Sequence, residues 1–464
     1  MNEDTICAIC TAPGMGAIAV IRVSGPEAFS ISDKIFKAAA ATKSISNAED
    51  HTVLLGNIHQ DERIIDEVVA TIFRNPHSYT GEDTVEFSCH GSVYIQQKII
   101  QLLIKNGCRM AEPGEYSRRA FTNGKMDLSQ AEAVADLIAS TSASNHKLAM
   151  QQMRGGFSRE LDKLRNDLLH FVTMIELELD FSEEEVEFAN RKDLNELAEK
   201  LETHLHKLTD SFRLGNALKN GIPVAIVGET NAGKSTLLNK LLNEDRAIVS
   251  AISGTTRDVI EDTVNINGLT FRFIDTAGLR QSTQDEIEKL GIERTYQKIE
   301  QAHIVLWVID STMVSEHIEW MAGKIIPRTK DKSLIILFNK SDKISKEEQL
   351  VLDDLFKIYS KNRIHLSAKK GENLDILRGK LLEIAGLPDL ERQDIVVTNL
   401  RHYEALTLAH EAILRVQQGL RDNQSSEFLS QDIRECLHHL GQITGVITSD
   451  EVLQNIFKNF CIGK

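Results

Sequence analysis

A glycine-bounded loop near the middle of the chain carries the residue types that bind phosphate. It begins at Gly228, after four apolar residues, and ends in Gly233, Lys234 and Ser235. This is the pattern G-x-x-x-x-G-K-[ST], set between a predicted strand and a predicted helix. The glycines let successive N–H groups face one phosphate, and the helix N-terminus adds partial positive charge. We expect Lys234 to reach the outer phosphates and the Ser235 hydroxyl to bind Mg²⁺. The alternative is a glycine-rich turn that binds nothing, which the strand and helix around it disfavour.

Two polar motifs at later strand ends indicate which nucleotide is bound. Asn339-Lys340-Ser341-Asp342 follows the apolar run 333–338, and the carboxylate of Asp342 can accept from two donors on a guanine edge. Adenine offers no such pair. Ser367-Ala368-Lys369 follows a third predicted strand and resembles a second guanine-contacting loop. The alternative for residues 339–342 is a polar turn between a strand and a helix.

Two further motifs suit the magnesium and γ-phosphate side of such a site. Asp275-Thr276-Ala277-Gly278 follows the predicted strand 271–274 and supplies a carboxylate and a glycine N–H. The segment 254–258 supplies threonines for a switch that closes on Mg²⁺. All of these motifs, in this order and at strand ends, resemble a translation-factor-type GTPase.

Composition limits the remaining possibilities. The 464 residues can form two to four domains, and a net charge of −15 implies no general affinity for nucleic acid. No apolar run approaches the length of a membrane span, so we expect a soluble, cytoplasmic protein. Six cysteines in so long a chain do not indicate a disulfide framework. We interpret Cys7 and Cys10, which spell C-x-x-C, as buried strand thiols.

The elements around the GTPase motifs fall into three groups. Residues 1–120 alternate apolar strands with turns and include a predicted helix over 92–105, which indicates an α+β domain. The segment 121–215 shows helical periodicity, with one apolar face formed by Leu194, Leu197, Leu201, Leu205, Leu208 and Phe212. An acidic connector, 180–187, interrupts it. The segment 386–464 has a similar face, formed by Leu406, Ala409, Ile413, Val416 and Leu420. We expect these two helical segments to pack together, with the GTPase module 216–385 inserted between them.

The whole chain resembles the MnmE (TrmE) family of tRNA-modification GTPases. The resemblance is carried by residues 79–83, 113–121, 123–133 and 460–464. It implies a multidomain α/β and α+β fold: an N-terminal domain (1–120) that binds tetrahydrofolate and forms a homodimer, a helical domain in two segments, and an inserted P-loop GTPase domain. It also implies that a flavoprotein partner, MnmG (GidA), joins in a heterotetramer. Together they add an aminomethyl or carboxymethylaminomethyl group to carbon 5 of the tRNA wobble uridine. A reduced folate, 5-formyl- or methylene-tetrahydrofolate, is implied as the one-carbon source.

The family's functional residues match named positions here. Arg22, Glu86, Lys125 and Lys464 match the folate contacts, and Cys461 matches a cysteine linked to the modification reaction. From the residues alone, Arg22 is equally well a surface arginine at a strand end, and Cys461 a small apolar residue. The positions that match GTP contacts are Asn231, Ala232, Gly233, Lys234, Ser235, Thr236, Ser250, Ala251, Ile252, Ser253, Gly254, Thr255, Thr256, Asp275, Thr276, Ala277, Gly278, Asn339, Lys340, Asp342, Ser367 and Ala368.

The resemblance also assigns the catalytic groups. Gly278 is followed by Leu279, which cannot orient a water molecule, so the resemblance assigns that role to Glu288. Mg²⁺ is assigned to Ser235 and Thr256. K⁺ is assigned to the Asn231 side chain and to carbonyl groups of Ser250, Ile252 and Thr255. The chain departs from the family at Thr230, where proline is usual, at Ser250, where threonine is usual, and by two extra residues before Glu288, which leave the register of that switch open.

Two rival functions remain open from the sequence. One is a GTPase switch in ribosome assembly or signalling without base chemistry. The other is a folate-binding scaffold with a vestigial GTPase. The acidic helical segments disfavour the first, and the intact nucleotide motifs disfavour the second.

Overall fold

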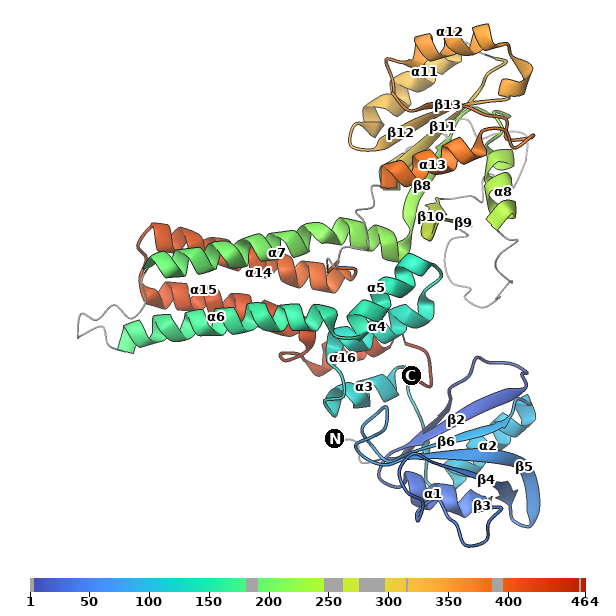
Figure 1. Cartoon of the computed structure of the whole chain (residues 1–464), viewed down its shortest axis with the longest axis vertical. Helices are drawn as coiled ribbons and strands as arrows, with labels where there is room; N and C mark the ends of the chain where they lie inside the picture. Colours follow the sequence, from blue (N-terminus) through green and yellow to red (C-terminus); the bar gives the residue numbers. More distant parts are fainter. Residues whose placement is uncertain are drawn as a thin grey trace. The chain divides into compact units, whose positions relative to one another are not determined.

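The computed structural model describes residues 4–180, 191–245, 262–274, 297–313, 316–385, 395–458 and 460–464. Contacts divide the chain into two compact units. The first comprises Met1–Ala139, Ala149–Leu205 and Glu404–Lys464, and the second Ser140–Leu148 and His206–Tyr403. Figure 1 shows the sheet of each unit and the long helices.

The first unit begins with a seven-stranded sheet in the order β3-β4-β5-β6-β2-β1-β7. Its strands are β1 (Ile6–Ile9), β2 (Ile18–Ser24), β3 (Phe36–Ala38), β4 (Thr52–Gln60), β5 (Arg63–Phe73), β6 (Thr84–His90) and β7 (Arg109–Met110). Neighbours are antiparallel except β1 and β7. The strands predicted in this region are therefore confirmed, as is the predicted helix, which is α2 (Val93–Lys105).

The two faces of this sheet have different coverings, because side chains alternate along each strand. Helices α1 (Ala28–Ile35) and α2 pack on one face, where Ile21 and Phe87 are fully buried. On the other face, Ile6 and Ala8 pack against Tyr116. Arg22 follows Ile21 in β2, and Glu86 precedes Phe87 in β6. The side chains of Arg22 and Glu86 therefore belong to the face opposite α1 and α2.

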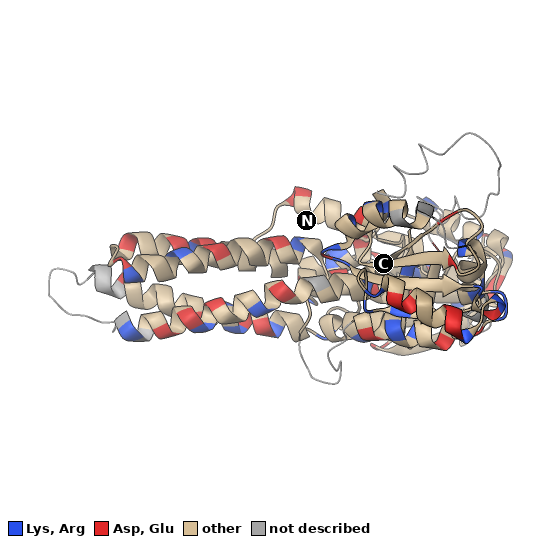
Figure 2. Cartoon of the chain, turned by 90° about the horizontal axis from the view of Figure 1, so that it is seen from above, with Lys and Arg blue, Asp and Glu red and all other residues tan. Residues whose placement is uncertain are grey.

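Helices complete the first unit. They include α3 (Glu115–Thr122), α4 (Leu128–Ala139), α6 (Gly156–Asp180), α15 (Ser426–Thr444) and α16 (Asp450–Phe457), with parts of α7 (Arg191–Asn220) and α14 (Leu400–Arg421). The predicted α14 face is confirmed, since all five residues are at most 3% exposed. In α7, Leu197 and Phe212 are only partly buried, whereas Ala198 is fully buried. Both acidic and basic residues occur along the long helices (Figure 2). Apart from residue 180, the acidic connector lies outside the described residues.

The second unit contains a six-stranded sheet in the order β13-β12-β11-β8-β10-β9. The strands are β8 (Ile222–Val227), β9 (Asp262–Ile266), β10 (Leu269–Phe273), β11 (Ile304–Asp310), β12 (Ser333–Asn339) and β13 (Arg363–His365). All are parallel except β9, which forms a hairpin with β10. Asn267 and Gly268 make its turn with φ values of 50° and 84°, as expected for an Asn-Gly hairpin turn.

Helices cover both faces of this second sheet. α8 (Lys234–Asp245) and α13 (Leu374–Ala385) share one core with it, and α11 (Glu316–Ile325) and α12 (Lys346–Phe356) share the other. A parallel sheet covered on both faces brings the carboxyl ends of its strands to one edge, where ligands of such folds bind. The predicted GTPase motifs follow β8, β12 and β13 at that edge.

Candidate functional site

The loop between β8 and α8 has the close contacts that require glycine. Gly228 has φ 146°, and a Cβ there would lie 2.1 Å from the carbonyl oxygen of Val308. Gly233 has φ 98°, and its Cβ would lie 2.0 Å from the Asn339 side-chain nitrogen. Both glycines are therefore required by the backbone conformation and by the neighbouring elements. The loop ends where α8 begins, at Lys234, so the helix N-terminus faces the loop.

Lys234 places its ammonium group inside this loop. Its Nζ donates to the carbonyl oxygens of Gly228 at 2.8 Å and Glu229 at 2.6 Å. Burial, and then the charge of Lys298, lower the pKa of Lys234 to about 8. A cation in such surroundings is stabilised by a nearby anion, so the loop is suited to a phosphate group.

Asn339 joins two segments of the site. One is the loop 228–233 between β8 and α8, which we call the phosphate-type loop, and the other is the segment after β13. Its Nδ2 donates to the carbonyl oxygen of Ala232 at 2.7 Å, and its Oδ1 accepts from the N–H of Ala368 at 3.0 Å. The side chain is buried, as are Ser367 and Ala368. One amide thus uses a donor and an acceptor to hold two loops together at the same sheet edge.

The two charged residues of the same motif have separate partners. Lys340, in the left-handed region at φ 63°, forms an ion pair with Asp310, the last residue of β11. Burial would raise the pKa of Asp310, but hydrogen bonds from Lys340 and Thr312 outweigh it and lower the pKa. Asp342 has a lowered pKa because it accepts a hydrogen bond from Ser367 and because Lys370 lies 3.3 Å away. Its carboxylate is therefore ionised, so both of its oxygens are hydrogen-bond acceptors.

Some of the remaining residues predicted for the nucleotide site lie in the described parts of the chain, and others do not. Asn231 is exposed with φ 63°, Ser235 is half-buried at the start of α8, and Thr236 is exposed. The predicted residues 250–256 and 275–278, together with Glu288, lie outside the described residues.

A second cluster of predicted residues lies on the first sheet, on the face opposite α1 and α2. Strand register places Arg22 opposite Glu86, and the two form an ion pair at 2.8 Å. The Arg22 guanidinium also lies 5.3 Å from the centre of the Tyr79 ring and 5.4 Å from that of Tyr116. Its side chain is only 12% exposed. The interpretation of Arg22 as a surface arginine at a strand end is therefore wrong.

The end of the chain joins this cluster. Lys464 Nζ lies 5.9 Å from the centre of the Tyr79 ring. The Cys10 thiol donates to the carbonyl oxygen of Gly463 at 3.3 Å. Gly463 has φ 95°, and a Cβ there would lie 2.6 Å from the Ile9 carbonyl oxygen. Cys10 is partly exposed just beyond β1, so the interpretation as a buried strand thiol is correct for Cys7 and wrong for Cys10.

Lys125 and Cys461 lie beside the same cluster. Lys125 Nζ donates to the carbonyl oxygen of Pro76 at 2.8 Å, and its stem packs near Gly81. Cys461 is exposed, and its carbonyl oxygen accepts from the N–H groups of Gly114 and Lys464. Cys461 lies beyond the last helix, α16, which ends at Phe457, so the alternative interpretation as a small apolar residue in a terminal helix is wrong.

Sequence reasoning did not identify three residues of these sites. Asp310 could have been found, because it follows an apolar parallel strand like the other site residues. Tyr79 and Tyr116 lie in two segments that carry the family resemblance, 79–83 and 113–121, but neither had an assigned role. Tyr116 donates to the Arg22 carbonyl oxygen at 2.9 Å.

Two family models together match nearly the whole chain, and named relatives match its full length. A family model described as MnmE helical domain matches residues 128–461, and one described as GTP-binding protein TrmE N-terminus matches residues 5–125. The tRNA modification GTPase MnmE of Bacteroides thetaiotaomicron is 61% identical over 100% of both chains. That of Parabacteroides distasonis is 58% identical over 99% of this chain and 100% of its own. A crystal structure of Era with MgGDPNP and part of 16S ribosomal RNA is 32% identical, covers 41% of this chain and 65% of that one, and has a TM-score of 0.28. Among the described residues, none of the helices has the length and apolar character that crossing a membrane requires.

Proposed function

The chain belongs to the MnmE family of tRNA modification GTPases, and we propose that its GTP hydrolysis drives the addition of an aminomethyl or carboxymethylaminomethyl group to carbon 5 of the tRNA wobble uridine. The observation that carries the GTPase part is the bridge made by Asn339. It joins the phosphate-type loop to the predicted guanine-contacting loop, next to an ionised Asp342. Such an arrangement suits a nucleotide whose phosphates and base are bound at one sheet edge.

The GTP-binding residues are proposed as the set matched in the sequence. Lys234 and the loop N–H groups would hold the outer phosphates, and Asp342 would bind the guanine edge. Ser235 and Thr256 would hold Mg²⁺, which neutralises charge on the phosphates. Asn231, with carbonyl groups of Ser250, Ile252 and Thr255, would hold K⁺. Glu288 would orient the attacking water through a bridging water.

The second cluster supports a binding site for a reduced folate. Arg22 and Lys464 supply cations, and Glu86 supplies an acceptor, around the Tyr79 ring. These groups suit a ligand with a flat polar ring and carboxylates, such as 5-formyl- or methylene-tetrahydrofolate. Lys125 borders the same loop. The exposed Cys461 would act in the modification reaction beside it.

Homodimerisation through the N-terminal domain has support on the same sheet face. Val53 and Leu55 of β4 are 60% and 52% exposed there. The strand register leads from Val53 through Thr71 to Glu86 and Arg22. A second copy covering these apolar side chains would also shield the proposed folate site from water.

The other parts of the proposal follow from family membership alone. They are the domain division 1–120, 121–215, 216–385 and 386–464, a heterotetramer with the flavoprotein MnmG, tRNA as the modified substrate, and a cytoplasmic location. The net charge of −15 implies that any tRNA contact is local or made through the partner.

Wobble nucleosides provide the direct test. A strain lacking this protein should lose the modified nucleoside in mass spectra of its tRNA, and the wild-type gene should restore it. A Lys234→Ala gene should not. Unchanged nucleosides together with altered ribosomal subunit profiles would instead identify an assembly GTPase.

A further inference from the structure

Side chains of β2 and α3 fix the loop that carries Tyr79. We call residues 78–84 the Tyr79 loop. The hydroxyl of Ser24, in β2, contacts this loop twice. It lies 2.8 Å from the Thr80 hydroxyl and donates to Glu82 Oε2 at 2.7 Å. Ser24 is fully buried at the end of β2, two residues after Arg22. The loop is thus attached to the strand that carries the proposed folate-site arginine.

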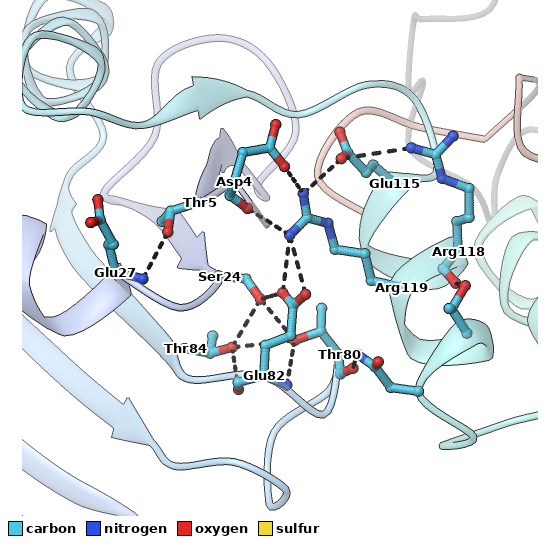
Figure 3. Close-up of polar contacts among 12 residues, drawn as sticks. Asp4, Thr5, Ser24, Glu27, Thr80, Glu82, Thr84, Glu115, Arg118 and Arg119 are labelled. Atoms are coloured by element: carbon cyan, nitrogen blue, oxygen red, sulfur yellow. Dashed lines mark hydrogen bonds and ion pairs between the residues drawn. The ribbon is translucent and has the colours of Figure 1, made fainter. Parts of the chain in front are cut away.

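Arg119 of α3 attaches the same loop to the helix. Its Nη1 donates to Glu82 Oε1 at 3.1 Å and to the Asp4 carbonyl oxygen at 2.9 Å. Its Nη2 donates to Asp4 Oδ1 at 2.8 Å and to Glu115 Oε1 at 3.0 Å. Figure 3 shows the guanidinium between Asp4 and Glu115 on one side and Glu82 on the other. With an 8% exposed side chain, Arg119 makes these charge-assisted bonds in a largely water-excluded environment.

Two further contacts join α3 and its C-terminal cap to the loop. The Tyr79 hydroxyl lies 2.8 Å from the Ser117 hydroxyl, and Asn123 Nδ2 donates to the Thr80 carbonyl oxygen at 2.8 Å. The Tyr79 ring is therefore held from α3, while its face meets the charges of Arg22 and Lys464. In the part of the chain that the structure describes, neither Arg119 nor Glu82 forms a hydrogen bond or ion pair with those two cations.

We propose that Arg119 is a positioning residue of the folate site, acting through Glu82 to fix the Tyr79 ring against which Arg22 and Lys464 are ordered. The inference rests on the proposed folate function. Its physical basis is that a guanidinium bound to three carboxylates permits few loop conformations, whereas the hydroxyl contacts alone permit more. The competing explanation is that Arg119 only stabilises the fold.

The first experiment reads the position of Tyr79 without any ligand. The full chain is labelled with 3-fluorotyrosine, and Tyr79→Phe assigns the Tyr79 signal in ¹⁹F spectra. Glu82→Gln keeps the shape of the side chain and removes its charge, and Arg119→Lys keeps the charge and removes the fork. Both should shift or broaden the Tyr79 signal and leave those of Tyr359 and Tyr403 unchanged. Arg118→Gln, on the same helix, is the matched control: Arg118 pairs with Glu112 at 3.4 Å and approaches Glu115 only to 3.7 Å, so the Tyr79 signal should not move.

The second experiment measures binding of 5-formyl-tetrahydrofolate by calorimetry on the same proteins. We expect Kd to rise at least fivefold in Glu82→Gln and Arg119→Lys, with the double variant no worse than the more affected single variant, and GTP turnover unchanged. An unmoved Tyr79 signal, or a moved signal with unchanged Kd, would overturn the positioning role. A wild-type chain that binds no folate would overturn the proposed function instead, and the ligand-free spectra distinguish that result.

Discussion

Asn339 donates a hydrogen bond from its side-chain amide to the carbonyl oxygen of Ala232 at 2.7 Å, across 107 residues of sequence. The same amide accepts from Ala368, so three segments of the nucleotide site depend on one buried side chain. Gly233 must be a glycine partly because this amide lies where its Cβ would be. The geometry of the phosphate-type loop is therefore coupled to the base-binding end of the site.

Replacing Asn339 with alanine should affect both the phosphate-type loop and the base-binding end of the nucleotide site. The variant leaves the Ala232 carbonyl and the Ala368 N–H without this partner, which costs about 1–3 kcal/mol of unfolding free energy. Affinity for GTP should fall as well. Urea unfolding and titration with a fluorescent GTP analogue measure the two effects. Asn239→Ala, at an exposed position of α8, is the control and should change neither. Wild-type affinity in Asn339→Ala would show that the bridge is not needed for binding.

Asp342→Asn should change the base preference. The carboxylate is a double acceptor, and the amide replaces one acceptor with a donor, which suits xanthine better than guanine. We expect GTP affinity to fall by about tenfold to a hundredfold, the range for a charge-assisted hydrogen bond, and xanthosine triphosphate to bind more tightly than in the wild type. Competition titrations with both nucleotides provide the measurement. Unchanged GTP affinity would remove the guanine assignment.

Nucleotide binding should take up a proton at alkaline pH. The pKa of Lys234 is about 8 in the free protein because burial disfavours its charge. A bound phosphate favours the charged form, so its pKa rises on binding. Affinity should then be independent of this group well below pH 8 and decrease as the pH rises above 8. Calorimetry in two buffers of different ionisation enthalpy should detect proton uptake above pH 8 and much less at pH 6.5. Equal uptake at both pH values would contradict the assignment.

Hydrolysis should depend on K⁺. A cation at the phosphates can replace an arginine finger, whose contribution to kcat is about 10³–10⁵. We expect fast turnover in K⁺, slow turnover in Na⁺, and loss of the difference in Asn231→Ala. Glu288→Ala should bind GTP normally and hydrolyse it poorly. Steady-state phosphate release in the two salts tests these expectations, and equal rates with a fully active Glu288→Ala would leave Asn231 as a loop-stabilising residue.

Cys461→Ser should separate chemistry from folding. The backbone carbonyl of Cys461, not its thiol, accepts the hydrogen bonds from Gly114 and Lys464. Melting temperature and GTP turnover should therefore stay at wild-type values, while modified wobble nucleosides fall in complemented cells. Cys436→Ser, at a fully buried position of α15, should instead lower the melting temperature. Wild-type nucleoside levels in Cys461→Ser would make its thiol dispensable.

Local sequence patterns were enough to predict parts of the nucleotide site and of the fold. The order of Gly228, Gly233 and Lys234 between an apolar run and a helix predicted the phosphate-type loop, because φ above zero and a helix N-terminus are local properties. The Asn-Gly turn of the β9–β10 hairpin and the buried face of α14 were predicted for the same reason, from dihedral preference and helical periodicity.

Contacts between groups that are distant in sequence depend on the tertiary fold. The pairing of Arg22 with Glu86 depends on the register of two antiparallel strands, and a slip of one residue would turn one of them to the opposite face. The contact of Cys10 with Gly463 spans 453 residues, and no local preference encodes it. Likewise, nothing in the local sequence around Arg119 indicates that its side chain is buried against Asp4, Glu82 and Glu115. Such contacts depend on chain folding, because burial and pairing stabilise a charge only once the partners have been brought together.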